Sequence, residues 1–209
     1  MIAPPERSPE RDAVIDALLL RVPTQGWTRT ALRAALADIG GDPADADLLF
    51  PGGAADMIEA FIDLSDRGME QAAAAPDFAE QRLPARVRGL IAHRFAQNRP
   101  HKEAIRRALA LLALPRNAVT AARCTARTVD AIWFLAGDRS ADFSWYTKRA
   151  SLAAIYSATL LFWLRDYSEE DEATLAFLDR RLKDIGRVGK LRRRIEESCA
   201  RRWPMRKAA

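Results

Sequence analysis

The sequence predicts an all-α protein with a small three-helix N-terminal head and a larger helical part. Ala, Leu, Arg, Asp and Glu dominate the 209 residues, whereas β-branched residues are sparse and polar and apolar residues seldom alternate over more than four positions. Apolar residues make up 49% of the chain, which is ample for a buried core. Helices should therefore carry nearly all of the fold.

The predicted head comprises three short helices. Pro9 to Val22 is expected to form the first, with a serine as its cap and proline at its first position. After a turn over residues 23–27, Thr28 caps the second helix, which a pair of glycines ends. Pro43 to Phe50 forms the third. This order of helices resembles a helix-turn-helix module, and we place the head at residues 8–52.

Longer helices should follow in a domain over residues 53–186, because apolar residues recur there at helical spacing. Their expected ranges are 54–75, 84–97, 101–114, 116–136, 142–165 and 169–185. The last of these helices is preceded by Ser168, whose hydroxyl and three following acids suit the positive end of a helix.

Positive charge is concentrated in the last segment, residues 187–209. Nine basic residues and two acids lie between Gly186 and Ala209, a net +7 within a total of +5, so the rest of the chain is slightly acidic. A basic amphipathic helix from Lys190 to Trp203 is expected there. It suits contact with anionic phospholipid, although a solvated tail would show the same charge. The candidate membrane contacts are Lys190, Leu191, Arg194, Ile195, Cys199, Arg202 and Trp203.

The sequence has no feature expected of an exported or membrane-spanning protein. Acidic and Pro residues occupy the N-terminus, where a signal peptide has a basic start and an apolar stretch. The longest nearly apolar run, Ala150 to Leu164, contains fifteen residues, short of the roughly 20 that cross a bilayer. Cys124 and Cys199 are far apart and indicate reduced thiols. We expect a cytoplasmic protein, peripheral on the inner face of the cell membrane.

No recognisable arrangement of catalytic or metal-binding residues is found in the sequence. The two histidines, His93 and His101, are eight positions apart across an expected helix break at Pro100. No phosphate-binding glycine loop, nucleophile elbow or Cys-x-x-Cys motif occurs. Carboxylates lie mostly at helix starts, where the helix dipole explains them. The sequence therefore predicts a protein that is not an enzyme and has no metal or cofactor.

The third helix of the predicted head is poorly suited to DNA. Asp42, Asp45 and Asp47 lie in or beside it, and it has no basic residue. A helix in the major groove lies beside two phosphate strands and donates hydrogen bonds to bases, so this helix would be repelled. Specific nucleic-acid binding is disfavoured. A DNA-binding transcriptional regulator with a hydrophobic effector remains the alternative function, since the head has the outline of a TetR-type repressor head.

Aromatic and charged residues cluster at the start of the expected helix over residues 142–165. Asp142, Trp145, Tyr146 and Arg149 are related by three, four and seven positions, so they share one helix face. The rings can belong to the core, with Asp142 and Arg149 as a surface ion pair. They can equally form an exposed patch, because Trp, Tyr and Arg are enriched in interface hot spots. Spacing alone does not decide between these interpretations.

Four segments give the chain a resemblance to the Coq-nine family, lipid-binding accessory proteins of ubiquinone biosynthesis with a TetR-like helical fold. The most specific is the Trp-Tyr-Thr-Lys-Arg stretch that ends at Arg149. The four segments are Gln25–Trp27, Leu49–Gly53, Asp142–Arg149 and Phe177–Arg181. The resemblance extends over roughly residues 10–190.

The resemblance implies a TetR-like homodimer that does not act as a repressor and that holds a lipid or an isoprenoid quinone intermediate. It also implies a surface for the Coq-seven type di-iron hydroxylase, which acts on demethoxyubiquinone. The residues implied at that surface are Leu135, Asp142, Trp145, Tyr146 and Arg149. Ile132 departs from the family, in which methionine is frequent at this position. The basic C-terminal segment matches the membrane-associating helix of the family by character rather than by motif.

A ligand cavity between helices needs large apolar side chains and few polar groups. The candidate lipid contacts are Phe95, Leu109, Leu112, Trp133, Phe134, Leu152, Ile155, Tyr156, Leu160 and Phe177. Each can equally be ordinary core. The implied function is that of an accessory protein that takes a quinone intermediate from the membrane and presents it to the hydroxylase. Sheltering the apolar tail from water is the physical step.

Overall fold

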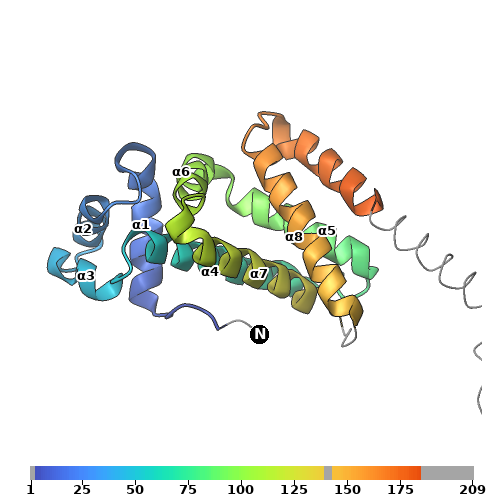
Figure 1. Cartoon of the computed structure of the whole chain (residues 1–209), viewed down its shortest axis with the longest axis horizontal. Coiled ribbons are helices and arrows are strands. Elements are labelled where there is room, and N and C mark those ends of the chain that lie inside the picture. Colours follow the sequence, from blue (N-terminus) through green and yellow to red (C-terminus); the bar gives the residue numbers. More distant parts are fainter. Residues whose placement is uncertain (1–2, 139–142, 185–209) are drawn as a thin grey trace, which may run out of the picture.

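The computed structural model describes residues 3–138 and 143–184, and its regular secondary structure within these ranges is entirely helical. The predicted all-α fold is therefore confirmed. Figure 1 shows the helices of residues 9–49 grouped at one end of the molecule and the later helices in the rest of it. This division matches the expected arrangement of a small head and a larger helical part.

The head contains α1 (Pro9–Gln25), α2 (Arg29–Asp38) and α3 (Ala46–Leu49). Ser8 and Thr28 cap the first two helices, as predicted: the side chain of each accepts a hydrogen bond from a backbone N–H three residues later, at 3.1 Å. These bonds satisfy donors that have no partner within the helix.

Two boundaries in the head differ from the prediction. α1 continues past Pro23, because proline has a helical φ and its missing N–H costs one hydrogen bond near the helix end. The Gly26 backbone N–H then donates to the Val22 carbonyl oxygen at 2.9 Å and closes the helix. The third predicted helix, Pro43 to Phe50, divides into a 3-10 turn over Pro43–Asp45 and the single turn of α3. Short 3-10 turns are frequent at helix N-termini.

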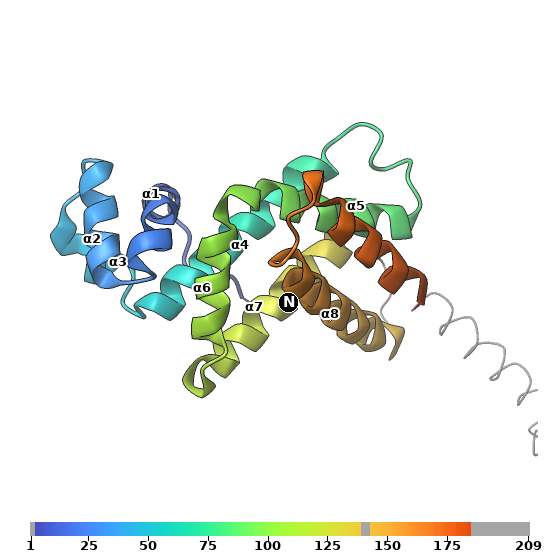
Figure 2. The ribbon, with the colours of Figure 1, turned by 90° about the horizontal axis from the view of Figure 1, so that it is seen from above.

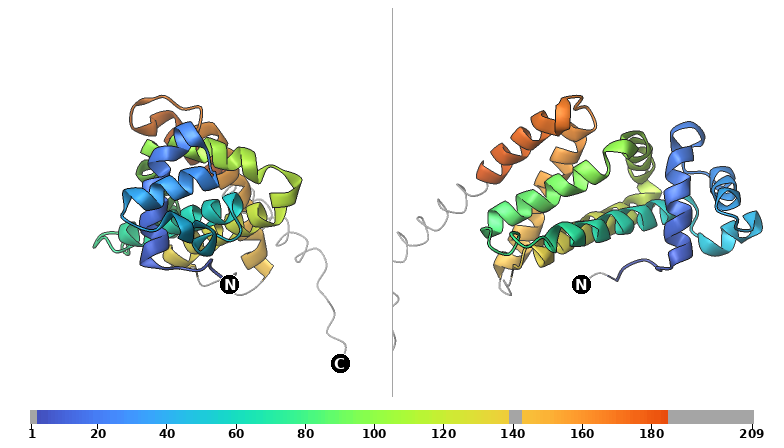
Figure 3. Two further views of the ribbon diagram at one scale, coloured as in Figure 1. Left: turned by 90° about the vertical axis from the view of Figure 1, so that its left-hand side faces the viewer. Right: turned by 180° about the vertical axis from the view of Figure 1, so that it is seen from behind.

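Two long helices, α4 (Ala54–Ala73) and α7 (Ala118–Leu135), run side by side through the molecule (Figures 1 and 3). α5 (Leu83–Gln97) packs against both, and α8 (Phe143–Trp163) packs against α7. α6 (Lys102–Leu112) lies between the head and these helices, as the view from above shows (Figure 2). The predicted boundaries of these helices are close to those observed.

The last described helix covers residues 172–184 and follows a sharp turn after α8. The turn contains a 3-10 segment, Glu169–Asp171, in which two acids adopt a positive φ. The helix starts three residues later than predicted, because residues 169–171 form the 3-10 segment, and the Ser168 hydroxyl accepts a hydrogen bond from the Ala173 backbone N–H at 3.0 Å across that segment. The Asp166 carboxylate accepts hydrogen bonds from the backbone N–H and the hydroxyl of Thr174. This cap was absent from the prediction.

The head shares its hydrophobic core with helices outside it. One cluster of buried apolar residues joins α1 and α2 to the first half of α4 and to α6. Within it, Trp27 is 3% exposed and its indole Nε1 donates a hydrogen bond to the Ala104 carbonyl oxygen. Arg11 of α1 also pairs with Asp56 of α4 at 2.8 Å. Buried contacts therefore continue across the predicted boundary between residues 52 and 53.

A second apolar cluster lies among α5, α7, α8 and the helix over residues 172–184. Three of its rings form a stack. The centroid of the Phe95 ring lies 6.0 Å from that of Tyr156 and 5.3 Å from that of Trp163. The stack joins α5 to α8, and all three rings line the cavity described next.

Candidate functional site

A cavity of about 350 Å³ lies between the two core clusters, with residues of α4, α5, α6, α7 and α8 in its wall. Most of the lining side chains are apolar, including Phe61 of α4 and Ile105 of α6. Ligand sites in proteins are typically concave, mostly apolar and about 300–1,000 Å³ in volume. The cavity is therefore large enough for a small molecule or for part of a longer lipid.

Half of the predicted lipid contacts line this cavity. They are Phe95, Leu109, Leu112, Tyr156 and Leu160. The other five lie elsewhere: Leu152 and Ile155 are buried in the second cluster, Trp133 packs against that cluster, Phe177 stacks on Phe162, and Phe134 is 70% exposed. Helical spacing identifies apolar faces, but it does not reveal which of them faces a void.

Polar side chains gather at the buried side of the cavity, and none of them is among the candidate residues predicted from the sequence. Ser65 Oγ donates a hydrogen bond to Asn98 Oδ1 at 3.1 Å, and Asn98 Nδ2 donates to the Arg94 carbonyl oxygen at 2.8 Å. Thr128 Oγ1 donates to the Asp66 carboxylate at 2.9 Å. All five residues are buried, so α4, α5 and α7 meet here through polar contacts rather than through apolar packing alone.

Arg94 is 5% exposed and lies at the centre of this polar network. Its Nε donates to the Tyr156 hydroxyl at 2.8 Å, and its Nη2 lies 3.2 Å from Asp66 Oδ1. Its Nη1 is buried and has no hydrogen-bond partner in residues 3–138 and 143–184. Burial raises the pKa of Asp66 to about 6, against the opposing effect of Arg94. The wall of the cavity therefore contains a guanidinium with an unused donor.

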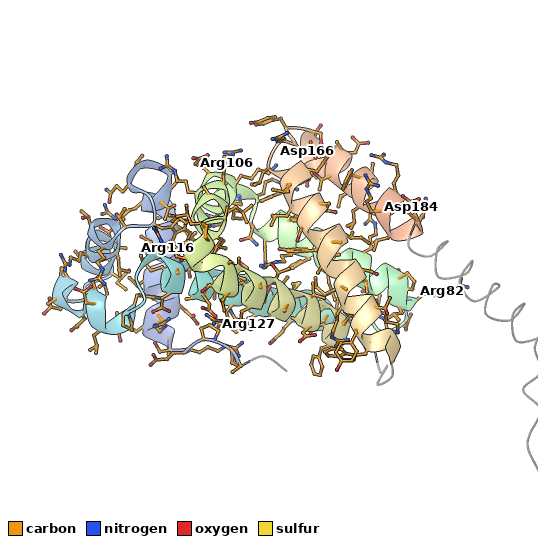
Figure 4. The ribbon with its side chains drawn as sticks, in the orientation of Figure 1. Arg82, Arg106, Arg116, Arg127, Asp166 and Asp184 are labelled. Carbon is orange, nitrogen blue, oxygen red and sulfur yellow. The ribbon has the colours of Figure 1, made fainter. Side chains whose placement is uncertain are left out.

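The opposite side of the cavity reaches the molecular surface. Leu161 lines the cavity and is 60% exposed, and the exposed residue Ala113 also contributes to the lining. These two residues come from α8 and from the end of α6. Arg106 of α6, labelled in Figure 4, donates a hydrogen bond to the Leu164 carbonyl oxygen at 2.8 Å and links α6 to the end of α8. The cavity thus has a polar buried side and an opening beside Leu161, with the half-buried Ser157 one helical turn away.

Trp145, Tyr146 and Arg149 come together at the start of α8. The two rings are T-shaped with centroids 4.8 Å apart, and the Arg149 guanidinium lies 3.7 Å from the centroid of the Trp145 ring. Arg149 Nε also donates to the Asp130 carboxylate of α7. Trp145 is half-buried, whereas Tyr146 is 67% exposed. The cluster is therefore a surface patch in which the half-buried Trp145 ring contacts both Tyr146 and Arg149. We call these three residues the α8 patch.

The remaining residues of the predicted partner and membrane surfaces are placed as follows. Leu135 is half-buried at the end of α7 and packs against the second cluster. Asp142 lies outside the described residues, as do Lys190, Leu191, Arg194, Ile195, Cys199, Arg202 and Trp203. Among the helices of residues 3–138 and 143–184, none combines the length and the apolar character needed to cross a membrane.

Exposed arginines of the head are paired with acids. Arg29 and Arg33 of α2 both pair with Asp47 of α3, the latter at 3.1 Å. Asp47 thus offsets two exposed arginines of α2. This arrangement follows the acidic pattern that disfavoured DNA binding in the sequence.

Within the described ranges, no three His, Cys, Asp or Glu side chains are grouped as metal ligands. His93 and His101 are both half-buried, and burial lowers the pKa of His101 while Asp16 opposes this shift. Cys124 lines the cavity, and burial raises the pKa of its thiol to about 11. The thiol is therefore neutral at physiological pH and poorly nucleophilic.

The helical head and the helices that follow it form a TetR-like fold. A TetR transcriptional regulator from Nitrosomonas europaea, known from its crystal structure, matches with a TM-score of 0.69. The match covers 84% of this chain and 97% of that chain at 24% sequence identity, and it shows the fold alone.

Sequence comparison shows the family. The COQ9 family model matches residues 118–189. The ubiquinone biosynthesis protein COQ9, mitochondrial, of Schizosaccharomyces pombe is 32% identical over 190 residues, which cover 91% of this chain and 75% of that protein. The chain therefore belongs to the COQ9 family, and the resemblance found in its sequence is confirmed.

Other relatives are longer than this chain. The proteins of the same name from Drosophila melanogaster and Homo sapiens are 33% and 31% identical to it. The matches cover 83% and 88% of this chain but 54% and 60% of the relatives. The chain thus spans less than two thirds of their length.

Proposed function

We propose that this chain binds a lipid or isoprenoid quinone intermediate of ubiquinone biosynthesis and presents it to demethoxyubiquinone hydroxylase, without catalysing a reaction itself. The observation that carries the proposal is the mostly apolar cavity of about 350 Å³, found in a member of a family whose relatives are named ubiquinone biosynthesis proteins. An apolar ligand gains free energy by leaving water for such a site.

The volume of the cavity limits what it encloses. About 350 Å³ is near the lower end of the range for ligand sites. A ring and the adjoining part of a tail fit such a space, whereas a long polyprenyl tail does not. The rest of the tail therefore has to leave through the opening beside Leu161.

Native mass spectrometry of the purified full-length chain tests the proposal. We expect adducts with the mass of a lipid or quinone, either co-purified or taken up from liposomes. Ala121→Trp should remove them, because Ala121 lines the cavity and a large ring there fills it. Ala118→Trp is the matched control, since Ala118 is exposed on the same helix and outside the cavity. Absence of adducts from the unmodified chain would exclude this function.

The α8 patch is the proposed contact for the hydroxylase. Aromatic residues and arginine dominate interface hot spots, and the patch combines an exposed tyrosine with an arginine held by Asp130. Binding of the purified hydroxylase, measured by surface plasmon resonance, tests this contact. No binding at micromolar concentration would exclude it.

Membrane contact through residues 187–209 and a homodimeric state complete the proposal. The net charge of this segment favours anionic phospholipid, which agrees with a cytoplasmic protein peripheral on the inner face of the cell membrane. Co-sedimentation with vesicles should require anionic lipid and should fall with added salt. Analytical ultracentrifugation tests the dimer.

A further inference from the structure

The polar side of the cavity bears on the chemistry of the ligand's head group. Arg94 lines the cavity, and two of its three guanidinium nitrogens are engaged by Tyr156 and Asp66. The third, Nη1, is buried without an acceptor in the described part of the chain. A buried donor without a partner is unfavourable, so an oxygen atom that reached Nη1 would be stabilised.

The charge of this site argues against an anionic ligand. Asp66 lies 3.2 Å from Arg94 and is itself buried, so its carboxylate offsets the positive charge of the guanidinium. Asp63 lies nearby but pairs with Arg7 and Arg67, so it adds no free charge to the site. A carboxylate or phosphate head group would lose its hydration at a guanidinium whose charge Asp66 already offsets, whereas a neutral oxygen would lose less hydration.

The shape of the cavity orients such a ligand. The polar residues Ser65, Asn98 and Thr128 lie on the buried side, whereas Leu161 is at the exposed side. If the head group enters the cavity before the tail, it reaches Arg94. The apolar tail then lies along the apolar wall toward the opening. The reverse orientation would leave the polar side against hydrocarbon.

We infer that Arg94 is a specificity-determining residue that selects ligands with a neutral oxygen acceptor on the head group, such as a quinone carbonyl or a ring ether. Its Nη1 donates to that oxygen at the buried side, and the tail leaves past Leu161. The inference rests on the proposed function, because it concerns the same cavity.

Three ligands with the same tail length separate the possibilities. A decyl-substituted benzoquinone has a neutral acceptor, decylbenzene has none, and decanoate has an anionic one. Their affinities are measured by displacement of Nile red from the full-length protein. We expect the quinone to bind about tenfold more tightly than decylbenzene, the factor that one charge-assisted hydrogen bond supplies. Decanoate should bind more weakly than the quinone.

Two variants assign the preference to Arg94. The paired variant Asp66→Asn with Arg94→Met removes both charges together and avoids an unpaired buried ion. It should bind decylbenzene as the original protein does but should prefer the quinone by less than about twofold. Asp66→Asn alone is the matched control. It retains the donor, so the quinone preference should remain, and it removes the offsetting charge, so decanoate should bind more tightly.

The outcomes are distinguishable. Equal affinity of the original protein for quinone and decylbenzene would overturn the inference, as would a preference for decanoate or a paired variant that keeps the quinone preference. If neither Nile red nor any of the three ligands binds, the proposed function itself fails. If the paired variant does not fold, the ligand comparison on the original protein decides.

Discussion

The Trp27 indole Nε1 donates a hydrogen bond to the Ala104 carbonyl oxygen at 3.0 Å, and this bond joins the head to α6. Because the indole is buried at 3% exposure, the bond is shielded from water. The same cluster contains apolar residues of α1, α2, α4 and α6. The head therefore depends on the larger part of the chain for the completion of its core.

Trp27→Phe should reduce the free energy of unfolding by about 1–3 kcal/mol, since it removes a buried donor and part of a large side chain. Urea denaturation followed by circular dichroism measures the change. Trp133→Phe is the matched control. Trp133 packs against the second cluster but its Nε1 has no hydrogen-bond partner within the described ranges, so that variant loses ring contacts without a hydrogen bond and should cost about 1 kcal/mol less than Trp27→Phe. Equal losses in the two variants would contradict a specific role for the Trp27 bond.

The positions of the helices could be predicted from the sequence because capping and periodicity are local. Ser8 and Thr28 cap the helices for which they were predicted. Local rules were less successful at Pro23, where α1 continues, and at residues 43–50, where two short turns replace one helix. In both places the outcome depends on the pairing of a few backbone groups rather than on a repeated pattern.

The cavity could be predicted only in part, because it depends on residues that face one another across the fold. Ala108 and Ala121 are small residues of α6 and α7 whose contribution to the void has no local signal. Arg94 could have been noticed in the sequence, because it lies on the apolar face of α5, one position before Phe95 and three after Ile91. A charged residue on such a face requires a partner, but nothing in the local sequence identifies Asp66 as that partner.

The raised pKa of Asp66 predicts how stability changes with pH. The pKa of this carboxyl rises from 3.8 to about 6 on folding, so between these values the folded state holds a proton that the unfolded state has released. Stability contributed by the neutral form is therefore present below about pH 4 and is lost as the pH rises to about 6. We expect this loss to be of the order of 1–3 kcal/mol.

Asp66→Asn isolates this effect, because other carboxylates titrate in the same range. The free energy of unfolding of the variant, minus that of the original protein, should increase from pH 4 to pH 7. Urea denaturation at intervals of half a pH unit measures it. A difference that stays constant with pH would show that Asp66 titrates normally.

Asp166→Ala should destabilise the helix over residues 172–184. The carboxylate accepts hydrogen bonds from the backbone N–H groups of Ser168 and Thr174 at 2.8 Å and from both hydroxyls. These bonds lower the pKa of Asp166 to about 2, although burial alone would raise it. Their loss should cost about 1–2 kcal/mol, as for other caps.

Hydrogen exchange of the amides in residues 172–184 measures the effect of Asp166→Ala locally, and urea denaturation measures it globally. Asp184→Ala is a suitable control, because Asp184 is exposed at the end of the same helix (Figure 4). The stability supplied by ionised Asp166 is present above about pH 4 and is lost as the pH falls toward 2. Equal exchange in the two variants would refute the capping role.

Tyr146→Ala should weaken hydroxylase binding at least about tenfold while changing stability by less than about 0.5 kcal/mol. The reason is that Tyr146 is 67% exposed and its ring contact is a T-shaped one with Trp145, so it contributes little to the core. Tyr167→Ala is the control, since Tyr167 is 89% exposed and lies outside the α8 patch. Surface plasmon resonance and thermal unfolding are measured on both variants. Equal weakening by the two changes would remove the α8 patch from the proposed interface.

The acidic head yields the final prediction, which separates the proposed function from that of a DNA-binding regulator. Asp47 holds both Arg29 and Arg33, so the head presents little free positive charge to phosphates. In a gel-shift assay at low salt, we expect no sequence-specific band. Any weak shift should come from residues 187–209, should disappear with added salt and should be absent from a variant that ends at residue 186. A specific complex that survived in that variant at physiological salt would favour the regulator.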